Sequence, residues 1–249
     1  MADIVTEAVR IVDEGQKRGI LLRIMGACAV RLHCPMFREL HVRMDRVLSD
    51  LDFATYSKFV PGLKGLFVDL NYKPNERIIA YHMYTRHVYY DEVGERTADV
   101  FVDKLDFCHT VSFAGRLEVD SPTIPLADIF LEKMQIVKMD SKDLKDLAIL
   151  LREHDIGGSE KETVNGDYIA KTLAGDWGFY YTVTTNLARL REFSSQNEVL
   201  GPDDRKDIAA KIDSLLATIE REPKSLGWRM RAKVGTKSKW YKEVEELGR

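Results

Sequence analysis

The segment VLSDLDFAT, residues 47–55, constrains the fold most strongly because it is typical of a β-strand yet carries two aspartates. Side chains alternate between the faces of a strand, so Asp50 and Asp52 point the same way, with Cα atoms about 6.5–7 Å apart. Leu51 and Phe53 then face the core. A divalent cation such as Mg²⁺ is a good reason to keep two like charges together, because it takes oxygen ligands beside a phosphate-bearing substrate. A solvated strand end is the alternative.

A glycine follows an earlier apolar strand, in the segment RIMGACAV. A backbone turn at Gly26 and Ala27 can bring N–H groups to a phosphate. The alternative is a turn glycine that packs closely on the sheet.

A third carboxylate is offered by TADVFVDKL, which places Asp99 in another apolar strand with Asp103 four residues later on the same face. If this strand lies beside the first, the added carboxylate can complete the metal site or take a proton from an attacking hydroxyl. We favour Asp99, because ADVFV has the better strand surroundings, and leave Asp103 open. Capping of the strand ends is the alternative for both residues.

The helical segment LADIFLEKMQIVKM carries a lysine at a step of its apolar stripe. Lys133 there either extends from the edge of the core to solvent or reaches towards a cleft, where it would offset charge on a transferring phosphate. The next predicted helix has Asp140 or Ser141 as its N-cap, and Asp143 in its first turn is well placed to favour the helix dipole.

Composition narrows the class of protein. The chain is 45% hydrophobic and 31% charged with a net charge of −3, which is typical of a soluble globular protein and predicts no membrane partner. The first residues form an amphipathic helix pattern rather than a signal peptide, and no apolar run approaches the roughly 20 residues of a membrane helix. The three cysteines lack zinc-ligand spacing, so we expect buried thiols and a cytoplasmic location.

The order of patterns predicts an α+β fold, with a mixed sheet of α/β type followed by a helical C-terminal region. A composition shift at DIGGSEKETVNG, residues 155–166, marks a linker, so we expect a core domain over residues 1–155 and a helical domain over residues 156–249. Within the core, residues 77–93 alternate well enough to predict one or two strands.

The basic and aromatic tail, GWRMRAKVGTKSKWYKE, interleaves tryptophans and a tyrosine with arginines and lysines. Such a surface suits a nucleic-acid backbone, so residues 228–242 could contact an RNA acceptor. The alternative is a helix–loop–helix segment whose tryptophans dock on the core.

Taken in order, the segments MGACAVRLH, RVLSDLDF, LEKMQIV and KDLKDLAILL resemble the nucleotidyltransferase superfamily, in particular the group that includes the abortive-infection toxins. The resemblance covers roughly residues 20–152. One departure concerns the turn, where the family has paired glycines or a glycine followed by serine or threonine. Here Gly26 is followed by Ala27 and Cys28, so no hydroxyl is available to contact phosphates.

The resemblance implies Mg²⁺-dependent (or Mn²⁺-dependent) transfer of a nucleoside monophosphate from an NTP to a hydroxyl of RNA, protein or a small molecule. Its implied metal ligands are Asp50, Asp52 and Asp99. The implied catalytic residues are Asp50, Asp52, Asp99 and Lys133. The implied nucleotide-binding residues are Gly26, Ala27, Arg46, Lys133 and Asp143. Two alternatives stay open: a nucleotide-binding module of the same fold with weak or no turnover, and the toxin component of a toxin–antitoxin pair.

Overall fold

The computed structural model describes residues 3–244, which divide into two compact units. The first unit holds residues 3–33, 47–105 and 111–125, and the second holds residues 34–46, 106–110 and 126–244. The predicted boundary after residue 155 differs from this division, because the helices that follow residue 125 pack with the C-terminal helices.

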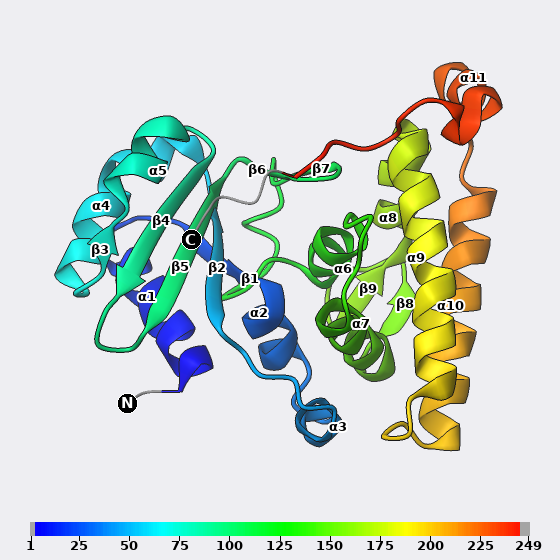
Figure 1. The fold of residues 1–249 in the computed structure, drawn as a ribbon, viewed down its shortest axis with the longest axis horizontal. Helices are drawn as coiled ribbons and strands as arrows, with labels where there is room; N and C mark the ends of the chain where they lie inside the picture. The colour runs from blue at the N-terminus through cyan, green and yellow to red at the C-terminus, as the bar shows by residue number, and fades with distance from the viewer. Residues whose placement is uncertain (1–2, 245–249) are drawn as a thin grey trace. The chain divides into compact units, whose positions relative to one another are not determined.

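The first unit combines a sheet with short helices (Figure 1). Its helices are α1 (Ile4–Lys17), α2 (Gly26–His33), η1 (Ser57–Phe59, a 3-10 helix), α4 (Val60–Asp69) and α5 (Glu76–Tyr81). Its strands are β1 (Leu22–Met25), β2 (Asp50–Thr55), β3 (Lys73–Pro74), β4 (Arg86–Asp91) and β5 (Arg96–Val102). Two further short strands, β6 (Lys104–Asp106) and β7 (Thr110–Ser112), lie where the chain passes between the units.

The five strands form one mixed sheet in the order β1-β2-β5-β4-β3. Strands β2 and β5 run parallel, whereas β1 is antiparallel to β2 and β4 is antiparallel to both β5 and β3. Because side chains alternate, Leu51 and Phe53 of β2 face the apolar core, whereas Asp50 and Asp52 lie on the opposite face. The predicted α+β class with a mixed sheet is confirmed.

Aromatic rings fill the core on the apolar face. Phe67 of α4 stacks on Tyr89 of β4, with ring centroids 4.0 Å apart, and meets Phe53 of β2 edge-on at 6.2 Å. Both partners are fully buried. Pro61 lies in the first turn of α4, where its missing N–H costs no helical hydrogen bond. Helix α4 therefore covers this face of the sheet.

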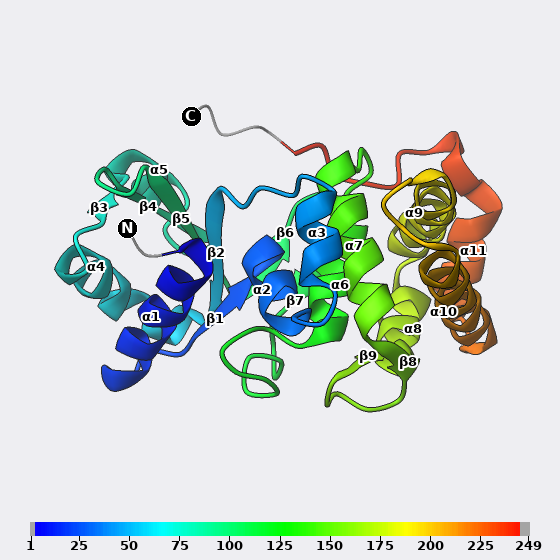
Figure 2. The same ribbon diagram turned by 90° about the horizontal axis from the view of Figure 1, so that it is seen from below.

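The second unit is mainly helical (Figure 2). Its helices are α3 (Arg38–Arg43), α6 (Leu126–Met134), α7 (Ser141–Glu153), α8 (Gly166–Gly175), α9 (Trp177–Gln196), α10 (Pro202–Arg221), α11 (Leu226–Val234) and η2 (Gly235–Lys237). Strands β8 (Asp155–Gly157) and β9 (Thr163–Asn165) pair in parallel. Helices α9 and α10 lie side by side in both views, and the predicted helical C-terminal region is confirmed.

Two local predictions differ from the structure. Residues 77–81 of the predicted strand segment instead belong to helix α5, because Asn75 caps the helix by accepting a hydrogen bond from the N–H of Ile78 at 3.1 Å. The predicted linker at residues 155–166 contains the β8–β9 pair. Among residues 3–244, no helix combines the length and apolar character that crossing a membrane requires.

The stacking of Phe67 yields a test of the core. Phe67→Ala is expected to lower the free energy of unfolding by about 3–5 kcal/mol, because it leaves a cavity against Tyr89 and Phe53. Val68→Ala is the matched control on the same helix, since Val68 is exposed and its truncation should cost under about 0.5 kcal/mol. Urea denaturation measures both, and equal losses would contradict the packing described.

Candidate functional site

The predicted carboxylates gather on the polar face of the sheet in the first unit. Asp50 and Asp52 lie on the same face of β2, half-buried, while Leu51 and Phe53 are buried on the other face. In the parallel pairing of β2 with β5, Asp52 lies directly beside Asp99. Neighbouring strands are about 4.8 Å apart, so three acidic side chains share one small area of this face.

The glycine turn also reaches this area. Met25, the last residue of β1, pairs with Asp52, and Gly26 begins α2 in the left-handed region with φ of +66°. A Cβ built on Gly26 would lie only 2.5 Å from Oδ2 of Asp52. Glycine therefore serves twice here, since it tolerates the backbone conformation and leaves room for the carboxylate. The positive end of α2, with Ala27 in its first turn, lies next to the negative charge of Asp52.

Asp99 has a partner that the sequence did not predict. Nε and Nη2 of Arg86, on β4, donate to the two carboxylate oxygens of Asp99, each at 2.9 Å. Among the described residues, oxygens of Asp50, Asp52 and Asp99 do not all come within 4.8 Å of one another. In this structure Asp99 is thus the ion-pair partner of Arg86 and does not complete a three-carboxylate metal site.

The alternation of side chains along β4 could have predicted the contact of Arg86 with Asp99. In the antiparallel pairing of β4 with β5, Arg86 lies opposite Phe101 and Val88 opposite Asp99, so Arg86 is the diagonal neighbour of Asp99 on the same face. Its guanidinium also lies over the ring of Phe101, 5.3 Å from the centroid. A long, forked side chain at such a diagonal position readily reaches a carboxylate.

Asp99 and Asp103 differ in their positions relative to Asp52. Asp103 lies past the end of β5, with φ of +62°, and its Oδ1 accepts a hydrogen bond from the backbone N–H of Ser57 at 2.9 Å. Its own N–H donates to the carbonyl of Thr55. Asp103 therefore fixes the connection into η1, and Asp99 is the acid that lies beside Asp52.

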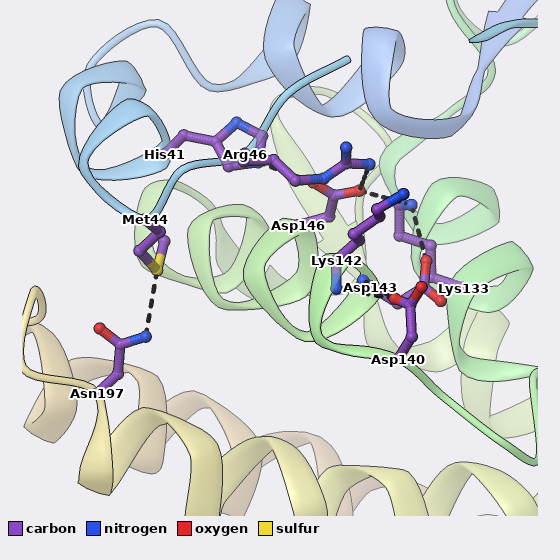
Figure 3. A network of polar contacts seen from close by, with 9 residues as sticks. All are labelled: His41, Met44, Arg46, Lys133, Asp140, Lys142, Asp143, Asp146 and Asn197. Carbon is purple, nitrogen blue, oxygen red and sulfur yellow. Dashed lines mark hydrogen bonds and ion pairs between the residues drawn. The ribbon is translucent and has the colours of Figure 1, made fainter. Parts of the chain in front are cut away.

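The remaining predicted residues form a separate buried network in the second unit, centred on Asp146 (Figure 3). Arg46 donates to both carboxylate oxygens of Asp146, at 2.8 and 2.9 Å. Nζ of Lys133 lies 2.7 Å from Asp146 Oδ2 and 3.3 Å from Asp143 Oδ1, and Nε2 of His41 lies 2.7 Å from Asp146 Oδ1. The sequence motifs include Arg46, Lys133, Asp143 and Asp146, but they predict neither the contact of His41 nor the central position of Asp146.

The start of α7 explains how this network forms. The side chain of Asp140 caps the helix by accepting from the N–H groups of Lys142 and Asp143 at 2.8 and 3.0 Å, which confirms the predicted cap. With the start fixed, Asp143 and Asp146 are three residues apart and share one face of α7. Lys133 of α6 contacts both.

Burial and neighbouring charges shift the pKa values of this network in opposite directions. Burial raises the pKa of Asp146, but Lys133, His41 and Arg46 outweigh it and hold that pKa below its ordinary value. Burial lowers the pKa of Lys133, but the charges of Asp146 and Asp143 raise it overall. Burial raises the pKa of Asp143 despite its contact with Lys133. Lys133 is therefore a charged ammonium that is committed to two carboxylates in this structure.

The aromatic tail docks on the second unit. Nε1 of Trp228 donates to the carbonyl of Leu173 and Nε1 of Trp240 donates to Oγ1 of Thr182, both at 3.1 Å. The backbone N–H of Lys242 donates to the carbonyl of Cys108 at 3.0 Å. Both tryptophans thus dock on the second unit through their indole N–H groups. Contact of residues 228–242 with RNA stays a prediction.

Comparisons of the chain with protein-family models, curated proteins and solved structures give no significant match.

The contact between Gly26 and Asp52 can be tested against a second left-handed glycine. Gly19 has φ of +70°, but a Cβ there would meet no atom within 4 Å. Gly19→Ala should therefore cost only the backbone strain of about 1–2 kcal/mol. Gly26→Ala should cost at least about 1 kcal/mol more, because the methyl group also displaces the Asp52 carboxylate. Equal losses in urea denaturation would show that the carboxylate does not occupy this position.

The buried network can be tested by removing its central charge. Asp146→Asn should lower the free energy of unfolding by about 3–5 kcal/mol, because it leaves buried cations unpaired. Asp213→Asn is the control: its ion pair with Arg191 is exposed and should be worth under about 1 kcal/mol.

The free energy of unfolding should also depend on pH differently in the wild type and in Asp146→Asn. Because the pKa of Asp146 is lowered in the folded state, its stabilising effect is present above the ordinary value of 3.8 and is lost as the pH falls below it. The stability difference between wild type and Asp146→Asn should therefore shrink in acid. A difference that stays constant from pH 7 to pH 3 would contradict the network.

Proposed function

We propose that the chain is a nucleotidyltransferase that moves a nucleoside monophosphate from an NTP to a hydroxyl acceptor. The observation that carries the proposal is the convergence of Gly26 and Asp52, with Asp50 on the same face of β2 and Asp99 beside Asp52 on β5. Residues from two strands and one helix terminus meet there. The cytoplasm suits this chain, because its three cysteines are buried thiols.

A divalent cation fits the pair Asp50 and Asp52. Both carboxylates are half-buried on one face of β2, and Oγ of Ser49 orients Asp50 by donating to its Oδ2 at 2.8 Å. Mg²⁺ commonly binds proteins through one or two carboxylates, with water and substrate phosphates as its other ligands, so a third carboxylate is not required. When bound, Mg²⁺ (or Mn²⁺) would neutralise charge on the triphosphate.

Protein groups around this pair supply the remaining contacts. The N–H groups that open α2 at Gly26 and Ala27 point along the positive end of the helix dipole, where a phosphate oxygen is stabilised. Arg86 fixes the orientation of Asp99 by two hydrogen bonds. A carboxylate has about four lone-pair positions, so Asp99 keeps the capacity to accept a hydrogen bond from the acceptor hydroxyl and position it for attack. Arg46, Lys133 and Asp143 belong to the buried network of the second unit and take no part in phosphate contact.

The second candidate is a binding module of the same fold that holds a nucleotide without turnover. The Arg86–Asp99 ion pair favours it, because both carboxylate oxygens of Asp99 already accept hydrogen bonds from the guanidinium of Arg86. The absence of a hydroxyl at Ala27 and Cys28 also favours it, since phosphate contact is then left to backbone groups.

The assay is pyrophosphate release from the four NTPs with Mg²⁺, together with transfer of labelled nucleotide to added RNA. Asp50→Asn and Asp52→Asn should each reduce the rate at least about 100-fold, since removal of a metal ligand raises the barrier by several kcal/mol. Asp13→Asn, at an exposed position on α1, is the control and should leave the rate unchanged.

Folding of each variant is checked by circular dichroism, because Asp52 also contacts the start of α2. Metal-dependent turnover that survives in both Asp50→Asn and Asp52→Asn contradicts the assignment. Nucleotide binding without turnover in the wild type identifies the binding module.

A further inference from the structure

A cavity of about 490 Å³ lies within the second unit, between the start of α9 and the C-terminal tail. Its volume falls in the range of about 300–1,000 Å³ that is usual for small-molecule sites. The lining combines flat aromatic rings with cations and includes Trp228, Arg231, Lys239, Trp240, Tyr241 and Lys242. None of these residues belongs to β1, β2 or β5, so the cavity is separate from the acidic site.

The wall formed by the tail is held in place by backbone contacts. A Cβ on Gly178, in the first turn of α9, would lie 2.3 Å from the carbonyl oxygen of Trp240, so only glycine lets the tail pass this closely. The guanidinium of Arg231 donates to the carbonyls of Gly235 and Ser238, at 2.7 and 3.0 Å. The rings are therefore positioned before any ligand arrives, which lowers the entropic cost of binding.

The aromatic rings differ in what they can offer. Trp177 stacks on Tyr181 and carries the guanidinium of Arg231 over its ring, 4.7 Å from the centroid, so it supports the wall. Trp228, Trp240 and Tyr241 are half-buried along the cavity. These are the rings that can receive a flat ligand.

The charge of the lining is positive. Lys239 and Lys242 have side chains that are 50% and 57% exposed, and each contacts a surface carboxylate. Such exposed ion pairs are worth little and exchange readily for a phosphate. The carboxylate of Asp176 is turned to the helix, where it accepts from the N–H of Phe179 at 3.1 Å. Burial lowers the pKa of His109 to about 4, so this residue adds no charge at neutral pH.

We propose that this cavity binds a nucleotide, with its base against the aromatic wall and its phosphate on Lys239 and Lys242. The lining complements two features of a ligand, a flat ring and an adjacent anion. Any of the bases can stack on an aromatic side chain, because every base has a flat π-face. The nucleotide can be free in solution or can be the end of a single-stranded RNA. This site goes beyond the proposed transfer reaction and needs neither Mg²⁺ nor Asp52.

The test is calorimetric titration of the full chain with AMP and, separately, with a single-stranded hexa-adenylate, in EDTA. The absence of free Mg²⁺ separates this test from the transfer assay, which requires the ion. Saturable binding of either ligand is expected. Binding of AMP alone identifies a free nucleotide as the ligand, and binding of the oligomer alone identifies an RNA end.

Two variants locate the binding. Gly175 lines the cavity, and a Cβ there would meet no atom within 4 Å, so Gly175→Leu adds apolar bulk at the cavity wall with room for its Cβ and should weaken binding at least 10-fold. Gly65→Leu, also with no atom within 4 Å of its Cβ but on α4, is its control.

Lys242→Gln should weaken binding and reduce the salt dependence by about one phosphate contact, whereas Lys206→Gln on the exposed side of α10 should not.

Failure of both ligands to bind at millimolar concentration would overturn the proposal. Binding that is unchanged in Gly175→Leu and in Lys242→Gln would overturn it as well, because the ligand would then lie elsewhere. Equal loss of binding in the two single variants Gly65→Leu and Gly175→Leu would also overturn it, since the loss would then not be specific to the cavity.

Discussion

The strand register of the sheet is the constraint on which the acidic site depends. Strand β2 is held between antiparallel β1 and parallel β5, and this pairing fixes which residues become neighbours. It sets Met25 and Asp99 on either side of Asp52, so the turn at Gly26 must pass the Asp52 carboxylate. A shift of one residue would turn every acidic side chain into the apolar core. Hydrophobic packing on the other face of the sheet therefore positions the polar chemistry.

The second unit shows how differently the same residue types can be used. Asp146 is fully buried and balances Arg46 and Lys133, whereas Asp50 and Asp52 are half-buried on one face of β2. Burial makes an unpaired charge costly, so the network of Asp146 is complete within the protein. Partial exposure lets carboxylates exchange water for an ion at modest cost. Burial, more than residue type, separates the structural acids of this chain from those that we propose to be functional.

Local sequence patterns predicted individual strands and helix caps better than they predicted which distant residues come into contact. The strand with Asp50 and Asp52 on one face and the cap at Asp140 both follow from nearest residues in the sequence. Helix α5 was not predicted, because the spacing of its aliphatic residues fits both a helix and a strand. Only the cap at Asn75 distinguishes the two. The pairing of Arg86 with Asp99 depends on which strands become neighbours, which tertiary packing decides. Roles assigned to single charged residues were therefore least predictable wherever a partner came from a distant element.

The most direct test of the acidic site is a crystal structure of the full chain with Mn²⁺ and a non-hydrolysable NTP analogue. Anomalous scattering identifies the ion independently of the protein atoms. We predict one manganese peak coordinated by carboxylate oxygens of Asp50 and Asp52, with phosphate oxygens next to the N–H groups at Gly26. A nucleotide bound without an ion at this pair, or an ion held elsewhere on the chain, would contradict the account.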